Sequence, residues 1–133
     1  MSHYHAVVWL DHSEAHVLHF TPEEVENEHI RSKEPHKHLH ARHTLHEKHQ
    51  EEAGYYHQIA AALHGAKEIL VVGPGAAKLD LIKHIHKHDH DLEPKVVGVE
   101  TVDHPSDGQL LKYARSYFLA ADRMIQGGNP VAG

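Results

Sequence analysis

The chain contains no cysteine among its 133 residues, which excludes a disulfide framework, a thiolate zinc site, an iron–sulfur cluster and a cysteine nucleophile. It has no apolar run near the roughly 20 residues of a membrane-spanning helix, and its first residues lack the shape of a signal peptide. The sequence therefore predicts a cytoplasmic protein with no membrane partner. A chain of this length holds one domain, which we place at residues 1–125, followed by a frayed tail over residues 126–133.

Histidine is the residue in excess, with 19 of the 133 positions. The 13 basic and 19 acidic residues leave a net charge of −6 while every histidine is neutral. Protonating about a third of the histidines cancels that charge, because histidine titrates near pH 6.5. Net charge is therefore a poor guide to partners, and any attraction to nucleic acid should depend steeply on pH.

The first half of the chain predicts a strand hairpin, a third strand and a helix. Two short runs of β-forming residues flank a polar turn, and a third segment alternates Val25, Asn27 and His29 with charged neighbours. Apolar residues at helical spacing then lead to Gly65, a typical helix end. The predicted elements are strands at residues 5–10, 15–20 and 24–30, an exposed loop at 31–45 and a helix at 46–64.

The second half alternates strands with helices. Two continuous apolar runs, at residues 68–72 and 95–100, are typical of strands covered on both faces. Helices are predicted after Gly75 and from about Gly108. The order β-β-β-α-β-α-β-α predicts an antiparallel start and then two parallel, right-handed crossovers. This is the ribonuclease H-like α/β architecture, a five-stranded mixed sheet with helices on both faces.

That architecture raises the possibility of a metal-dependent nuclease, which needs several carboxylates at adjacent strand ends. Asp11 follows the first strand, but the fourth strand ends in Gly73-Pro74-Gly75 without an acid. Asp103 and Asp107 come late after the fifth strand. The acidic residues therefore give this activity little support.

Two segments are candidates for phosphate contacts. The turn with Gly73, Gly75 and Lys78 joins a strand to a helix, where backbone N–H groups can receive an anion. A tight turn that simply needs glycine is the alternative, since no nucleotide-binding motif is present. The loop over residues 31–45 has four fixed positive charges, from Arg31, Lys33, Lys37 and Arg42.

The histidines allow a second interpretation, as metal ligands. Three of them alternate in the loop, and two are spaced i, i+4 on a predicted helix; these are His36, His38 and His40, and His84 and His88. No HExxH motif is present. Zinc or nickel could bind such residues, but a solvated histidine-rich surface is the simpler alternative, and no cofactor is expected to be required.

Asp107 is predicted to cap the last helix, and Ser106 has no partner base for nucleophilic catalysis.

The pattern from Tyr4 to about Ile125 resembles the central domain of the eukaryotic and archaeal peptide-chain release factor and of its paralogue Pelota. The residues that carry the resemblance are the strand and turn Ile69-Leu70-Val71-Val72-Gly73-Pro74-Gly75 with Lys78, and Val97-Gly98-Val99-Glu100-Thr101-Val102-Asp103. The opening hairpin fits the first two strands of the family. The chain looks most like a small stand-alone bacterial form, a translational machinery protein.

One departure from the family limits what the resemblance implies. Release factors carry a Gly-Gly-Gln tripeptide between the third strand and the first helix, and here residues 31–45 contain neither glycine nor glutamine. Peptide release is therefore not expected. The resemblance implies a non-catalytic, translation-associated factor that binds the ribosome or structured RNA. The alternative is a histidine-based metal-binding protein or a metal-dependent hydrolase.

Overall fold

The computed structural model describes residues 5–32 and 45–127. The predicted order of elements is confirmed, and a short 3-10 helix, η2, is added between α2 and β5. The elements are β1 (His5–Leu10), β2 (Glu14–Phe20), β3 (Val25–Arg31), α1 (Leu45–Leu63), β4 (Glu68–Gly73), α2 (Ala77–His88), η2 (His90–Lys95), β5 (Val96–Thr101) and α3 (Asp107–Gly127).

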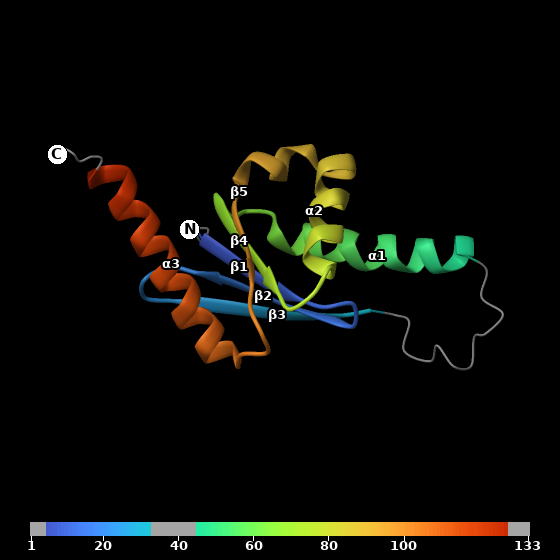
Figure 1. Cartoon of the computed structure of the whole chain (residues 1–133), viewed down its shortest axis with the longest axis horizontal. Helices are drawn as coiled ribbons and strands as arrows, with labels where there is room; N and C mark the ends of the chain where they lie inside the picture. Colours follow the sequence, from blue (N-terminus) through green and yellow to red (C-terminus); the bar gives the residue numbers. More distant parts are fainter. Residues whose placement is uncertain (1–4, 33–44, 128–133) are drawn as a thin grey trace.

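The strands form a single mixed sheet in the order β3-β2-β1-β4-β5. β1, β2 and β3 are antiparallel neighbours, while β4 runs parallel to both β1 and β5. Helices α1 and α2 cover one face of this sheet and α3 covers the other, as Figure 1 shows. The predicted five-stranded α/β architecture is therefore confirmed.

Alternate side chains of the central strands fill two separate cores. Val8 and Val71 point to the core under α1 and α2, whereas Val7 and Val72 point to the core under α3. Because β1 and β4 supply both cores, every residue after the first in each of these strands is buried. This explains the continuous apolar runs in their sequences.

The prediction that residues 95–100 form a strand buried on both faces is wrong. β5 is an edge strand, and Val97 and Val99 are 43% and 39% exposed. The helices pack over the inner strands, α2 over β1 and β4 and α3 over β1. The apolar run in β5 therefore reflects the β propensity of valine rather than burial on both faces.

Gly65 ends α1 as the sequence predicts. Its φ is +99°, a conformation that L side chains rarely adopt. The chain can therefore turn sharply from Leu63 into β4.

In the part of the chain that the structure describes, no helix is both long and apolar enough to cross a membrane.

Candidate functional site

One edge of the sheet brings together several of the residues singled out in the sequence. β1, β4 and β5 end at this edge, where β2 begins and β3 ends. Arg31 is the last residue of β3 and Gly73 the last of β4. Three strand spacings separate these two strands, which corresponds to about 14 Å. Open α/β sheets bind ligands outside the carboxyl ends of their parallel strands, so this edge is the candidate site.

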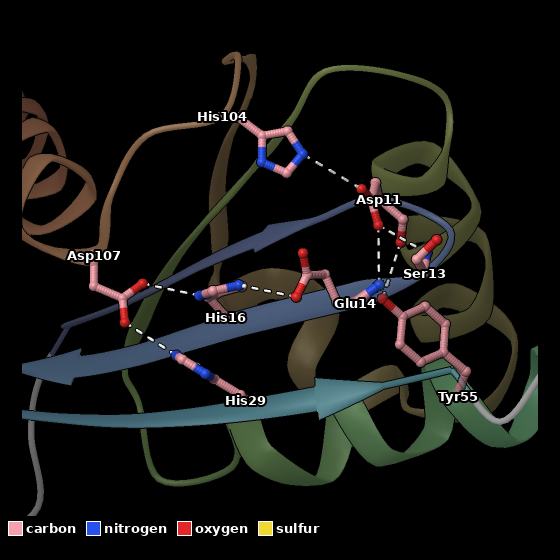
Figure 2. Close-up of polar contacts among 8 residues, drawn as sticks. All are labelled: Asp11, Ser13, Glu14, His16, His29, Tyr55, His104 and Asp107. Atoms are coloured by element: carbon pink, nitrogen blue, oxygen red, sulfur yellow. Dashed lines mark hydrogen bonds and ion pairs between the residues drawn. The ribbon is translucent and has the colours of Figure 1, made fainter. Parts of the chain in front are cut away.

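Asp11, directly after β1, shapes the turn into β2. Its Oδ1 accepts hydrogen bonds from the backbone N–H groups of Ser13 and Glu14, at 2.7 and 2.9 Å (Figure 2). The Tyr55 hydroxyl donates to the Asp11 carbonyl at 2.9 Å. Burial, and then the negative charge of Asp11, raise the pKa of Tyr55, so this phenol stays protonated. Asp11 therefore acts as a turn-forming residue, and its Oδ2 lies 3.6 Å from Nε2 of His104.

A carboxylate between two histidines joins α3 to the sheet. Oδ1 of Asp107 lies 2.9 Å from Nδ1 of His16 on β2, and its Oδ2 lies 3.0 Å from Nε2 of His29 on β3 (Figure 2). The two imidazole rings are neighbours, with centroids 4.1 Å apart. Burial alone would raise the pKa of Asp107, but the hydrogen bonds from His29 and His16 outweigh it and hold that pKa below its usual range. Asp107 is therefore an anion that fixes the start of α3 over β2 and β3.

The prediction that Asp107 caps the last helix is wrong. The residue before it, Ser106, forms a reciprocal pair with Gln109: the Gln109 N–H donates to the Ser106 hydroxyl at 3.2 Å, and the Ser106 N–H donates to the Gln109 side chain at 2.9 Å. This is a capping box, which needs a serine and a glutamine three residues apart. The sequence contains that signal. The carboxylate of Asp107 is left free to bind the two histidines.

The segment between β5 and α3 is anchored by Trp9. This indole is 2% exposed, and its N–H donates a 2.6 Å hydrogen bond to the carbonyl of Asp103. The ring of His104 packs on it, with centroids 4.2 Å apart. These contacts hold the start of α3 at the same edge as the turn after β4.

The turn from β4 into α2 has a lysine that points back into it. Lys78 is only 8% exposed, and its Nζ donates a 2.6 Å hydrogen bond to the carbonyl of Gly75. A Cβ on Gly73 would collide with the carbonyl oxygen of Leu10, whereas a Cβ on Gly75 would meet nothing within 4 Å. Close packing therefore requires glycine at position 73 and not at position 75. The phosphate contact predicted for this turn stays a prediction.

Arg31 is exposed and lies beside a groove between β3 and α1. The groove has a volume of about 520 Å³, and residues 28–31 and Gln58 contribute to its walls. An arginine guanidinium is always charged and presents five hydrogen-bond donors that match a phosphate group. The other predicted loop residues, namely Lys33, Lys37, Arg42, His36, His38 and His40, lie outside the described residues.

The remaining predicted histidines lie away from this edge, on α2. The ring centroids of His84 and His88 are 4.8 Å apart, as their i, i+4 spacing predicts. The structure brings two further residues to His84. His57 from α1 and Asp89 at the end of α2 each place a ligand atom within 4.8 Å of one from His84 and of each other.

No cluster of three carboxylates occurs in the described ranges 5–32 and 54–121. Groups of three potential metal ligands there are His16, His29 and Asp107, and His57, His84 and Asp89. Each contains a single acid. Two-metal hydrolysis needs several convergent carboxylates, so the geometry gives the nuclease interpretation no support.

The sequence matches no protein-family model and no curated protein. Solved structures do match it. The Thermoplasma acidophilum Pelota protein superposes with a TM-score of 0.60 at 18% identity, covering 84% of this chain and 32% of that one. The archaeal translation termination factor aRF1 gives a TM-score of 0.56 at 12% identity, with 93% and 41% covered. Saccharomyces cerevisiae Dom34, a translation termination-like factor, gives 0.51 at 14% identity, with 95% and 40% covered.

The fold is Pelota- and release-factor-like. The resemblance that the strand and turn residues 69–75 suggested is therefore confirmed in three dimensions. This Pelota-like chain spans only 32–41% of the length of these solved proteins. At identities of 12–18% the likeness establishes the fold.

Proposed function

We propose that this chain is a non-catalytic, translation-associated factor of the cytoplasm that binds the ribosome or structured RNA through phosphate contacts. The observation that carries the proposal is the match of its fold, over 84–95% of its length, to Pelota, aRF1 and Dom34. The names of aRF1 and Dom34 connect those proteins with translation termination, and that of Dom34 also with RNA quality control.

The binding surface in this proposal is the carboxyl edge of the sheet together with the segment that follows β3. Arg31 stands at the end of β3, exposed and beside the groove along α1. Lys33, Lys37 and Arg42 follow within eleven residues, with Glu34 as the one acidic residue among them. Lysine and arginine side chains bind nucleic acid by neutralising backbone phosphates and releasing counterions.

The same segment argues against peptide release. Residues 32–44 contain neither glycine nor glutamine, so the Gly-Gly-Gln tripeptide of release factors is missing between β3 and α1. A programmed ribosome carrying peptidyl-tRNA should therefore release peptide at the background rate when this protein is added. A single-turnover rate well above background, lost when residues 31–45 are replaced, would contradict this part of the proposal.

Co-sedimentation with ribosomes at several salt concentrations tests the binding. A variant with glutamine at the four basic positions is compared with one that loses four lysines elsewhere. The first variant replaces Arg31, Lys33, Lys37 and Arg42; the second replaces Lys67, Lys83, Lys87 and Lys95. We expect the first to bind more weakly and to lower the salt slope by up to about four, since each phosphate contact contributes about 0.9. Equal losses in both variants would mean non-specific attraction and would overturn the proposal.

The pH dependence separates phosphate binding from metal binding by the loop histidines. Phosphate prefers charged imidazoles, whereas a metal competes with the proton for the ring nitrogen. We expect ribosome affinity to rise between pH 8 and pH 6, and the rise to flatten when His36, His38, His40 and His43 become glutamine. If the ribosome affinity instead falls as the pH is lowered and is abolished by a chelator, the loop histidines bind a metal.

A further inference from the structure

We infer that His57, His84 and Asp89 form a site for a divalent transition metal, most simply Zn²⁺, between α1 and α2. The site lies apart from the proposed RNA-binding edge. α2 starts at that edge and runs back across the sheet, so His84, seven residues after the start of the helix at Ala77, lies about 10 Å along the helix axis from it. Failure of the RNA proposal would therefore leave this inference untouched.

The packing of α1 on α2 brings the three residues together. Ile59 and Leu63 of α1 share a core with Leu81 and Ile85 of α2, so the two helices lie against each other on one face of the sheet (Figure 1). His57 stands on α1 at the border of this contact.

The other two residues come from α2 and its end. His84 lies one residue before Ile85, and Asp89 closes α2 by donating its backbone N–H to the Ile85 carbonyl at 2.9 Å. A ligand atom from each of His57, His84 and Asp89 lies within 4.8 Å of the other two.

Two of the ligand atoms are buried without a hydrogen-bond partner, which is the observation that points to a bound ion. The side chains of His84 and Asp89 are 9% and 15% exposed. Among the residues that the structure describes, Nε2 of His84 and Oδ2 of Asp89 have no hydrogen-bond partner. A buried polar atom is costly unless it is paired, and a bound water or ion is one way to pair it.

The separation of these two atoms fits a metal better than a direct contact. Nε2 of His84 and Oδ2 of Asp89 are 3.4 Å apart. Ligand bonds of about 2.0–2.2 Å at a tetrahedral angle place two ligand atoms about 3.4 Å from each other. His57 is exposed, so its side chain can rotate to complete three protein ligands. His88, one helical turn beyond His84, or a water molecule can take the fourth position.

The ligand types of the site also suit a metal. Two imidazoles, one carboxylate and an open position form a ligand set that suits Zn²⁺.

The second histidine–carboxylate cluster provides a contrast. In the group of His16, His29 and Asp107, each carboxylate oxygen already has a histidine nitrogen at 2.9 or 3.0 Å. That cluster is satisfied by its own hydrogen bonds, so nothing there calls for an ion. Among the described residues of the two clusters, only His84 and Asp89 have buried side-chain atoms without a hydrogen-bond partner.

A competition titration of the metal-free full chain with Zn²⁺ against a chromophoric chelator tests the site at pH 7.5. The chelator outcompetes weak zinc binding by isolated surface histidines, so the titration reports only a tight site. We expect one tight equivalent in the wild type, also in a variant with glutamine at His36, His38 and His40, and in the matched control His64→Gln. Affinity should fall at least about tenfold in His57→Gln and in His84→Gln.

His57→Gln keeps the test decisive, because this side chain is exposed and its loss cannot unfold the core. Cobalt(II) in place of zinc provides a spectroscopic check, since an intense visible absorption marks a four-coordinate site and should disappear in both ligand variants. No tight equivalent in the wild type, or equal affinities in His57→Gln, His84→Gln and His64→Gln, would overturn the inference.

Discussion

Replacing Lys78 with methionine should destabilise the protein by about 1 kcal/mol and leave the salt dependence of RNA binding unchanged. The physical reason is the direction of the lysine. Its ammonium donates to the Gly75 carbonyl at 2.6 Å and its side chain is almost entirely covered. We therefore expect this ammonium to hold the turn after β4 together rather than to contact a phosphate.

The magnitude follows from what each substitution removes. Methionine keeps an unbranched stem of similar length, so Lys78→Met loses chiefly one hydrogen bond, worth about 1 kcal/mol because water can still reach the exposed Gly75. Lys78→Ala also removes three buried methylene groups at about 0.8 kcal/mol each. The alanine variant should therefore lose about 3 kcal/mol in total.

Urea denaturation measures both variants, with the slope of the unfolding free energy against urea as the check that unfolding remains two-state. The control is Lys83→Met, because Lys83 is an exposed lysine of the same helix and should change stability by less than about 0.5 kcal/mol. Ribosome co-sedimentation at several salt concentrations supplies the second measurement on the same three proteins.

The opposite pattern would refute the reasoning. If Lys78→Met is as stable as the wild type and its salt slope is lower by about one, the ammonium binds a phosphate. The turn would then be a phosphate site, as the sequence suggested, and the hydrogen bond to Gly75 would be unimportant.

Four further substitutions test the same edge, with urea denaturation as the measurement. Gly73→Ala should lose at least about 2 kcal/mol because its Cβ meets the Leu10 carbonyl, whereas Gly75→Ala should be neutral or slightly stabilising; similar values would contradict the packing argument. Ser106→Ala should lose about 1 kcal/mol with the capping box, and no loss would mean that the cap contributes nothing. Asp107→Asn should lose about 1 kcal/mol near neutral pH, since both ion pairs are partly exposed. The pKa of Asp107 is below its ordinary value of 3.8, so its contribution is present above that pH and is lost as pH falls through the lowered pKa. A difference between wild type and Asp107→Asn that persists in acid, where both side chains are neutral, would refute this assignment.

The order of the elements and the class of the fold could be read from local patterns. Runs such as residues 68–72 are continuous because β4 supplies two cores, and Gly65 ends α1 because only glycine takes its positive φ readily. The same argument wrongly predicted that both faces of β5 are buried. Val97 and Val99 favour a strand at the exposed edge of the sheet as much as in its centre. Strand propensity indicates that a side chain fits a pleated surface, and it does not tell whether one or both faces of the strand are covered.

Functional sites were harder to predict than helices and strands. The spacing of polar residues in the sequence does not show which other residue each one will contact. Ser106 and Gln109 did carry a local signal, a capping box, which the assignment of Asp107 as the cap overlooked. Lys78 follows a glycine-containing turn, which suggested a phosphate contact, and only its direction in the folded chain showed a bond to Gly75.

Sequence alone determined the strands, the helices and their order, since these follow from the spacing of apolar side chains along short stretches of chain. It also determined the absence of the Gly-Gly-Gln tripeptide, which requires no coordinates. Tertiary structure decided which polar residues meet. Asp107 binds a histidine 91 positions away on β2, and His57 reaches His84 only because both crossovers proceed in the same direction across the sheet and place α1 and α2 on one face. Such contacts depend on the packing of whole elements, and no short stretch of sequence contains them.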